Sequence, residues 1–149
     1  MPPTDPVVAE LWTQQDAARG YTELARRCEA LFVALGRLAP QLEADEATVA
    51  AATLARRLGR HSAAWAALVP ESVLLEDARA SAREVPPLAD GIDAALTAVE
   101  ALRADLQHFL TRSSDVADAD ARALARVVLG DIDASWAGMR PSLTGSASR

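Results

Sequence analysis

One histidine and one aspartate in this chain occupy positions that could support acid/base chemistry. His61 projects within about 40° of the centre of the apolar stripe of its predicted helix, at about 100° per residue. Asp133 occurs on a later helical segment, between Ile132 and Trp136. A carboxylate beside an imidazole fixes its tautomer and can assist a general base. Two interpretations follow: a catalytic pair of His61 and Asp133, or a satisfied core histidine with a partly solvated aspartate.

Aromatic and hydroxyl side chains near His61 could line a ligand pocket. The candidate ligand-binding residues are Tyr21, Ser62, Trp65 and Trp136. Such a pocket would accept a small apolar or aromatic molecule between the helices. The alternative is that Trp65 and Trp136, each five residues before a proline, fill equivalent layers of a helical core.

The candidate residues belong to a unit that occurs twice, at an offset of 71 residues. The matches are Gly20/Gly91, Glu29/Glu100, Leu31/Leu102, Leu35/Leu106, Leu58-Gly59/Leu129-Gly130, Trp65/Trp136 and Pro70/Pro141. Because these matches hold one register across two successive helical segments, the repeated unit is predicted to be a helical hairpin. The same register makes Ser62 and Asp133 equivalent, which predicts that Asp133 lies at the height of His61.

The elements that must position these residues are all predicted to be helical. Apolar residues follow the helical period throughout, and no stretch alternates as a strand would. After Gly20 a helix is predicted to end near 38, and further helices are predicted over 45–69, 88–111 and 118–139. The segment 71–87 is long enough to run the length of a bundle as a crossover. The sequence predicts an all-α four-helix bundle built from two repeated hairpins, about 18–70 and 89–141.

One domain is therefore expected over 1–141. A short N-terminal helical extension carries Val8, Leu11 and Trp12, and the polar segment 142–149 is expected to be a disordered tail.

Composition excludes several classes of partner. The net charge is −6 and there is no basic stripe, so no nucleic-acid partner is predicted. No run approaches the roughly 18 apolar residues of a membrane span, and no signal sequence is evident, so a cytoplasmic protein without membrane association is expected. Cys28 is the sole cysteine and lies on an apolar helical face, which is typical of a buried structural thiol.

Two helical hairpins related by a repeat and joined by a long crossover resemble the ferritin-like superfamily, over roughly 18–141. The resemblance implies a two-metal site with one Glu on each of the first and third helices and a Glu-x-x-His on each of the other two. Glu29, Glu100 and His61 are the matching residues. The other motif positions are apolar, namely Leu58, Leu129 and Ile132.

Glu29 and Glu100 also lie about 110° from the centres of their apolar stripes, at the rim of a bundle. A degenerate site with no metal and no cofactor is therefore predicted.

Three hypotheses for function remain. The first is a metal-free, ferritin-like accessory module that binds a small molecule or a protein partner. The second is an enzyme that acts on an apolar or aromatic small molecule with His61 and Asp133 as the acid/base pair. The third is a structural homodimer in which the segments 7–12 and 73–75 bury against a second copy.

Overall fold

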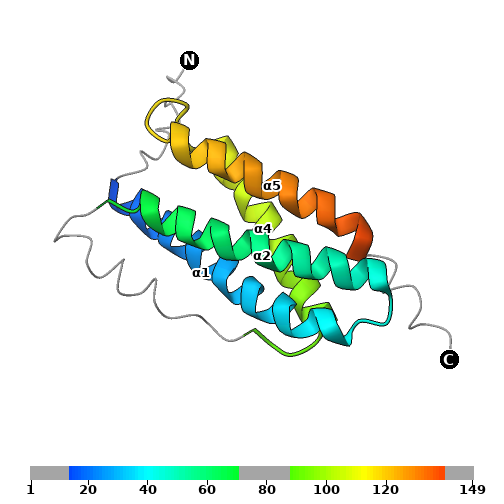
Figure 1. Ribbon diagram of the computed structural model, residues 1–149. Coiled ribbons are helices and arrows are strands. Elements are labelled where there is room, and N and C mark those ends of the chain that lie inside the picture. The colour runs from blue at the N-terminus through cyan, green and yellow to red at the C-terminus, as the bar shows by residue number, and fades with distance from the viewer. Residues whose placement is uncertain (1–13, 71–87, 140–149) are drawn as a thin grey trace, which may run out of the picture.

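The computed structural model describes residues 14–70 and 88–139, and within these ranges the chain is an all-α four-helix bundle without strands (Figure 1). Its elements are α1 (Gln14–Leu38), the short 3-10 helix η1 (Ala39–Gln41), α2 (Asp45–Leu68), α4 (Ile92–Arg112) and α5 (Ala119–Met139). The predicted fold class is confirmed. None of the described helices combines the length and the apolar character that crossing a membrane requires.

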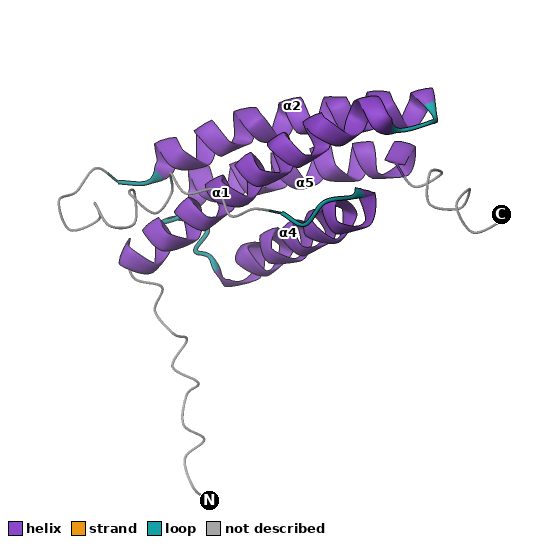
Figure 2. Ribbon diagram, turned by 90° about the horizontal axis from the view of Figure 1, so that it is seen from below, coloured by secondary structure: helices purple, strands orange, loops and turns teal. Residues whose placement is uncertain are grey.

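The four long helices form a closed ring of neighbours. α1 packs against α2 and α4, and α5 packs against the same two helices. Tyr21, Leu68 and Asp118 line one cavity, so the start of α1, the end of α2 and the start of α5 meet at one end of the bundle. Leu38 and Gly91 line a cavity at the opposite end, so α4 runs antiparallel to α1 (Figure 2).

The end of α2 and the start of α4 therefore lie at opposite ends of the bundle (Figure 1). The predicted crossover over 71–87 that joins them lies outside the described residues. The predicted N-terminal extension and the tail over 142–149 also lie outside them.

Local sequence signals account for the helix ends. Asp45 and Glu46 place negative charge in the first turn of α2, where it complements the helix dipole. Val69 is extended, with ψ of 120°, because the following Pro70 disfavours helical backbone before it. α4 begins at Ile92 rather than at the predicted 88, because Gly91 has φ of +109°, which interrupts a helix and which glycine adopts readily.

The core lies along the common axis of the four helices. Its largest fully buried side chains are aliphatic apart from Trp65, Met139 and Cys28, and include Leu31, Leu35, Leu54, Leu58, Leu102, Leu106, Ile132 and Val128. The predicted burial of Cys28 is confirmed. Burial, followed by the charge of Glu29, raises the pKa of the Cys28 thiol to about 12, so this sulfur stays protonated at neutral pH.

The first helices of the two repeated hairpins, α1 and α4, bury residues at positions that the 71-residue offset relates. The second helices, α2 and α5, for the most part bury positions that the offset does not relate. Leu31 and Leu102 are both fully buried, as are Leu35 and Leu106. Trp65 is fully buried, whereas Trp136 is only half-buried. The buried face of α5 follows Val128, Ile132, Ser135 and Met139. This face is turned by about one residue from the face that the offset from α2 predicts, which is roughly 100° around the axis.

Candidate functional site

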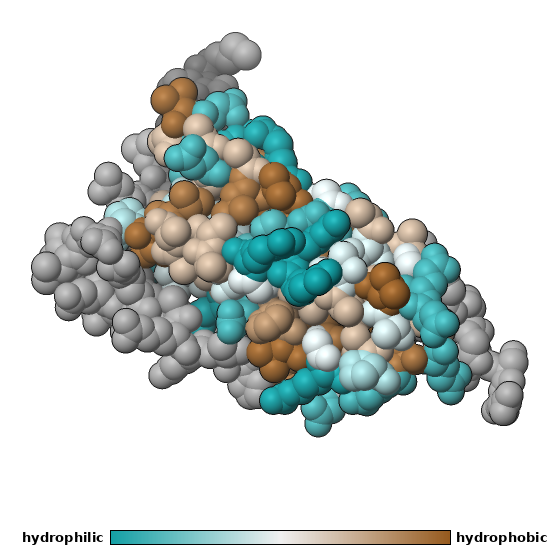
Figure 3. All heavy atoms as spheres, viewed as in Figure 1, coloured by the Kyte–Doolittle hydropathy of each residue, from teal (hydrophilic) through white to brown (hydrophobic). Residues whose placement is uncertain are grey.

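The predicted imidazole contact with a carboxylate exists at the seam between α2 and α5, but with a different aspartate. His61 Nε2 lies 2.7 Å from Oδ2 of Asp131. Arg57, one turn before His61 on α2, donates from Nη1 to Oδ1 of Asp131 at 2.9 Å. Hydrophilic side chains gather on the molecular surface over this seam (Figure 3). Both oxygens of Asp131 are thus held by side chains of α2.

Of the two interpretations of His61 and Asp133, the direct pair is not formed. Asp133 is exposed and accepts a hydrogen bond from Nε of Arg103 on α4, at 2.8 Å. The physical reason is the rotation of α5: Ile132 points into the core, so residues 131 and 133 lie on opposite flanks. The flank of Asp131 faces α2, and the flank of Asp133 faces α4.

The chemistry open to this cluster is limited by Arg57. The side chains of His61 and Asp131 are 12% and 22% exposed, so the pair is largely shielded from solvent. Asp131 can orient the imidazole, as a carboxylate does beside a general base. The same carboxylate also neutralises Arg57, which makes the cluster an ionic link between two helices.

Two of the three predicted aromatic residues, Tyr21 and Trp65, form a packed cluster with Phe109 at the end of the bundle that holds Asp118. Tyr21 and Trp65 have ring centroids 5.8 Å apart, and Phe109 lies edge-on to both at 6.2 and 6.0 Å. These separations are those of rings in direct contact. Trp65 is therefore a core residue, and the described ring contacts do not include Trp136. Ser62 is buried, on the face of α2 that carries Trp65.

Sequence reasoning missed Phe109. It lies three residues after the buried Leu106, and the spacing of Val99, Leu102, Leu106 and Phe109 follows the helical period, which was the available signal.

Asp118 is a second residue that the sequence did not single out. It is 8% exposed, and its Oδ1 accepts a hydrogen bond from the Tyr21 hydroxyl at 2.6 Å. Its Oδ2 accepts the backbone N–H of Ser114 at 2.9 Å. Burial, and then the hydrogen bond and charge of Asp118, raise the pKa of Tyr21, so this hydroxyl acts as a donor and not as a base. A cavity of about 210 Å³ borders the two residues.

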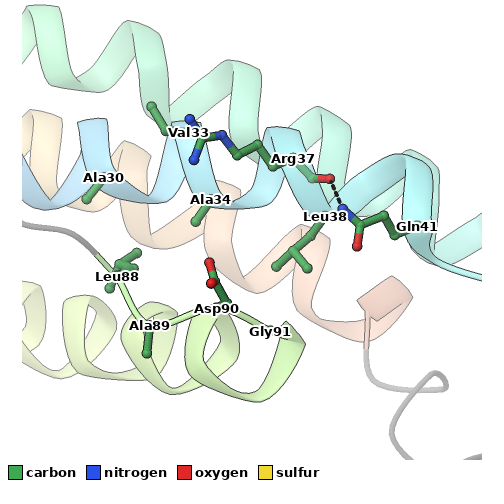
Figure 4. Close-up of a pocket in the computed structure, with 10 residues that line it drawn as sticks. All are labelled: Ala30, Val33, Ala34, Arg37, Leu38, Gln41, Leu88, Ala89, Asp90 and Gly91. Atoms are coloured by element: carbon green, nitrogen blue, oxygen red, sulfur yellow. Dashed lines mark hydrogen bonds between the residues drawn. The ribbon is translucent and has the colours of Figure 1, made fainter.

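The largest of the described cavities lies between α1 and the segment that leads into α4. It has a volume of about 750 Å³ and is lined by Ala30, Val33, Ala34, Arg37, Leu38, Gln41, Leu88, Ala89, Asp90 and Gly91. Figure 4 shows Ala30, Ala34 and Leu38 on the side of α1 that faces this segment, with Leu88 and the carboxylate of Asp90 directed toward them. We call this cavity, together with a second cavity that continues it along α1, the α1–α4 groove.

A second cavity of about 300 Å³ continues the groove along α1, because Ala30 and Leu88 line both cavities. Its apolar lining includes Ala98 and Ala101 of α4. Its charged rim is already neutralised, since Arg27 pairs with Glu23 and with Asp105. His61, Asp131 and Asp133 line none of the three cavities described above.

The residues present do not fit a two-metal centre. Glu29 is half-buried and Glu100 is exposed, and the interior between them holds leucines. Among residues 14–70 and 88–139, no three or more His, Cys, Asp or Glu side chains gather as a metal site would require.

Comparison with known proteins identifies no relative from which a function could be inferred. No protein-family model, curated protein or solved structure matches this chain. The α1–α4 groove and the Arg57–Asp131–His61 cluster are therefore weighed on their chemistry alone.

Proposed function

We propose that this protein is a non-catalytic helical-bundle module that binds a small amphipathic molecule in the α1–α4 groove. The observation that carries the proposal is a cavity of about 750 Å³ whose lining combines alanine, valine and leucine side chains with Arg37 and Gln41, and into which the carboxylate of Asp90 is directed. Pockets for small molecules span roughly 300–1,000 Å³ and combine apolar walls with a few polar groups.

The lining favours a ligand with an apolar body and a cationic end. Ala30 and Ala34 leave room beside α1, and Leu38 and Leu88 offer apolar contact. Within the described residues, Asp90 has no hydrogen bond or ion pair. Arg37 also lines the cavity, but its guanidinium is directed away from Asp90 and does not pair with it (Figure 4). An ammonium group on the ligand would give the Asp90 carboxylate a direct counter-charge.

Three probes with the same eight-carbon chain test the proposal: octylamine, octanol and octanoate. We expect affinity to fall in that order, measured by amide chemical-shift titration and by the rise in Tm with probe concentration. Asp90→Asn should bring octylamine down to the affinity of octanol. Ala34→Trp should fill the groove and weaken all three probes.

Asp93→Asn is the matched control, because Asp93 is an exposed aspartate three residues after Asp90, in the first turn of α4, and does not line the groove. Equal affinity for the amine and the carboxylate, or the same loss in Asp93→Asn as in Asp90→Asn, would refute binding in the groove.

A ferritin-like arrangement with replaced metal ligands is part of this proposal. It is supported by the antiparallel packing of α1 and α4 and by the positions of the end of α2 and the start of α4 at opposite ends of the bundle. Elemental analysis of the purified protein should find no stoichiometric iron, manganese or zinc. About two metal ions per chain would contradict the assignment of a lost site.

An enzyme is the second candidate, favoured by the 2.7 Å contact between His61 and Asp131. In this alternative His61 is the acid/base group and Asp131, in place of Asp133, orients it. The groove proposal ranks first because none of the three described cavities brings a substrate to His61.

A further inference from the structure

The outer face of α5 carries a stripe of apolar and small residues that face solvent. The stripe consists of Ala123, Val127, Gly130, Ala134 and Ala137, all of them exposed. Their spacing alternates between four and three residues, which is the spacing of a seam between two packed helices. Val127 is 54% exposed, and hydrophobic residues reach the surface along α5 (Figure 3).

No contact among the described residues accounts for a glycine at position 130, in the middle of α5. A Cβ added there would meet nothing within 4 Å. By contrast, a Cβ at Gly59 would press on the ring of Phe32 at 3.1 Å, and one at Gly138 would collide with Ala50 at 2.8 Å. Glycine is a poor helix former, so a mid-helix glycine is explained where another backbone approaches closely.

The charges beside the stripe are complementary when α5 packs against its own copy in the antiparallel direction. Arg126 and Asp133 lie on the same side of the stripe, because Arg126 immediately precedes Val127 and Asp133 immediately precedes Ala134. In a two-fold antiparallel pair, Val127 lies opposite Gly130 of the other copy, and Arg126 lies beside Asp133 of the other copy. Symmetry forms this ion pair twice.

Both side chains are able to make this contact. Among the described residues, Arg126 has no hydrogen bond or ion pair. Asp133 uses Oδ1 to accept from Arg103, and a carboxylate has further acceptor positions on its second oxygen.

We propose that the outer face of α5 binds a second copy of this chain, in an antiparallel two-fold dimer centred between Val127 and Gly130. The surface is separate from the α1–α4 groove, because α5 contributes no lining residue to either cavity of the groove. The dimer leaves the groove of each copy open.

Charge reversal tests the pairing directly, by sedimentation equilibrium of the full chain over a series of concentrations. The wild type should show a monomer–dimer equilibrium. Arg126→Asp and Asp133→Arg should each raise the dimer Kd, because each places like charges together. The double variant should bring the Kd back toward the wild-type value, since it restores both pairs with the charges exchanged.

Val127→Asp and Gly130→Leu test the seam. Val127→Asp should raise the Kd by at least about tenfold. Gly130→Leu should favour the helix while weakening the dimer, because leucine blocks the close approach. A fold defect cannot produce this combination of a higher Tm and a higher Kd at Gly130.

Val49→Asp is the matched control, since Val49 is a 65% exposed valine on α2. A wild-type chain that stays monomeric at every concentration would overturn the proposal. An equal effect of Val49→Asp and Val127→Asp, or a double charge reversal no better than the singles, would also overturn it.

Discussion

Asp131 and Asp133 flank the buried Ile132 on α5, and their carboxylates have different partners. Asp131 holds Arg57 and His61 of α2 in a half-buried cluster, whereas Asp133 holds Arg103 in an exposed pair. An ion pair that is largely shielded contributes more to stability than one that water and salt screen. Substituting each aspartate in turn therefore shows how much the ionic link between α2 and α5 contributes to the free energy of unfolding.

Asp131→Ala is expected to lower the free energy of unfolding by about 1–3 kcal/mol, because it leaves His61 and Arg57 without their acceptor. Asp133→Ala should change it by less than about 1 kcal/mol. Urea denaturation measures both. In a double-mutant cycle, His61→Ala with Asp131→Ala should recover part of the summed loss. Additive losses would show that the two side chains are not coupled.

Cys28 and Tyr21 predict a loss of stability at alkaline pH. The pKa of Cys28 rises from 9.0 to about 12 in the folded chain, and that of Tyr21 rises from 10.0. A raised pKa means that the stabilisation is fully present below the unfolded pKa and is lost as pH rises toward the folded one. The free energy of unfolding should therefore fall between about pH 9 and 12.

Cys28→Ala should reduce the slope of that fall, although it lowers stability at every pH by leaving a cavity. Denaturation at a series of alkaline pH values checks this. A slope that Cys28→Ala leaves unchanged would show that the thiol does not contribute to it.

The ends of the helices are fixed by single residues whose roles differ in kind. Arg122 of α5 closes the turn from α4, donating from Nη1 to the carbonyl of Leu110 at 2.6 Å and to Ser113 at 2.8 Å. It thereby satisfies a carbonyl that the end of a helix leaves without a partner. Gly91 sets the start of α4 by its backbone conformation alone.

Gly91→Ala and Gly36→Ala are expected to have opposite effects on stability. At either position an added Cβ meets none of the described atoms within 4 Å, so crowding by the described residues plays no part. Gly91 has φ of +109°, a conformation that alanine adopts only with strain, and its substitution should destabilise by about 1 kcal/mol or more. Gly36 lies within α1, and alanine there should stabilise by about 0.5–1 kcal/mol. Thermal unfolding compares the two, and a stabilised Gly91→Ala would contradict the strained start of α4.

The four seams of the whole molecule are packed unequally. α1 and α2 pack most closely, whereas the seam between α1 and α4 is the loosest of the four. The α1–α4 groove is the result of that loose seam, and alanines form much of its lining. A bundle built to bury as much apolar area as possible would fill this space with larger side chains.

Ala34→Leu is expected to be neutral or stabilising, because the cavity of about 750 Å³ accepts the added atoms. Ala51→Leu is the matched change in a tight part of the core, since Ala51 is fully buried on α2. It should destabilise by about 1–3 kcal/mol through overpacking. Chemical denaturation measures the difference, and an equal loss in both variants would mean that the groove is closed in solution.

The sequence by itself determined the four helices, their approximate ends and most of the core. This is possible because the apolar period and the helix-breaking prolines act locally, within a few residues along the chain. Leu31, Leu35, Leu102 and Leu106 are buried as their stripes predict. Two residues of the candidate site, His61 and Trp65, are placed on the inward side of α2 by the same local signal.

Only the tertiary structure decided which flank of each helix meets which neighbour. The helical period does not distinguish residue 131 from residue 133, since each lies about 100° from Ile132 around the helix axis. The rotation of α5 against α2 and α4 depends on the packing of all four helices, and it gives Asp131 to His61 and Asp133 to Arg103. The Tyr21–Asp118 bond and the α1–α4 groove have the same origin, because they join residues that no local pattern relates.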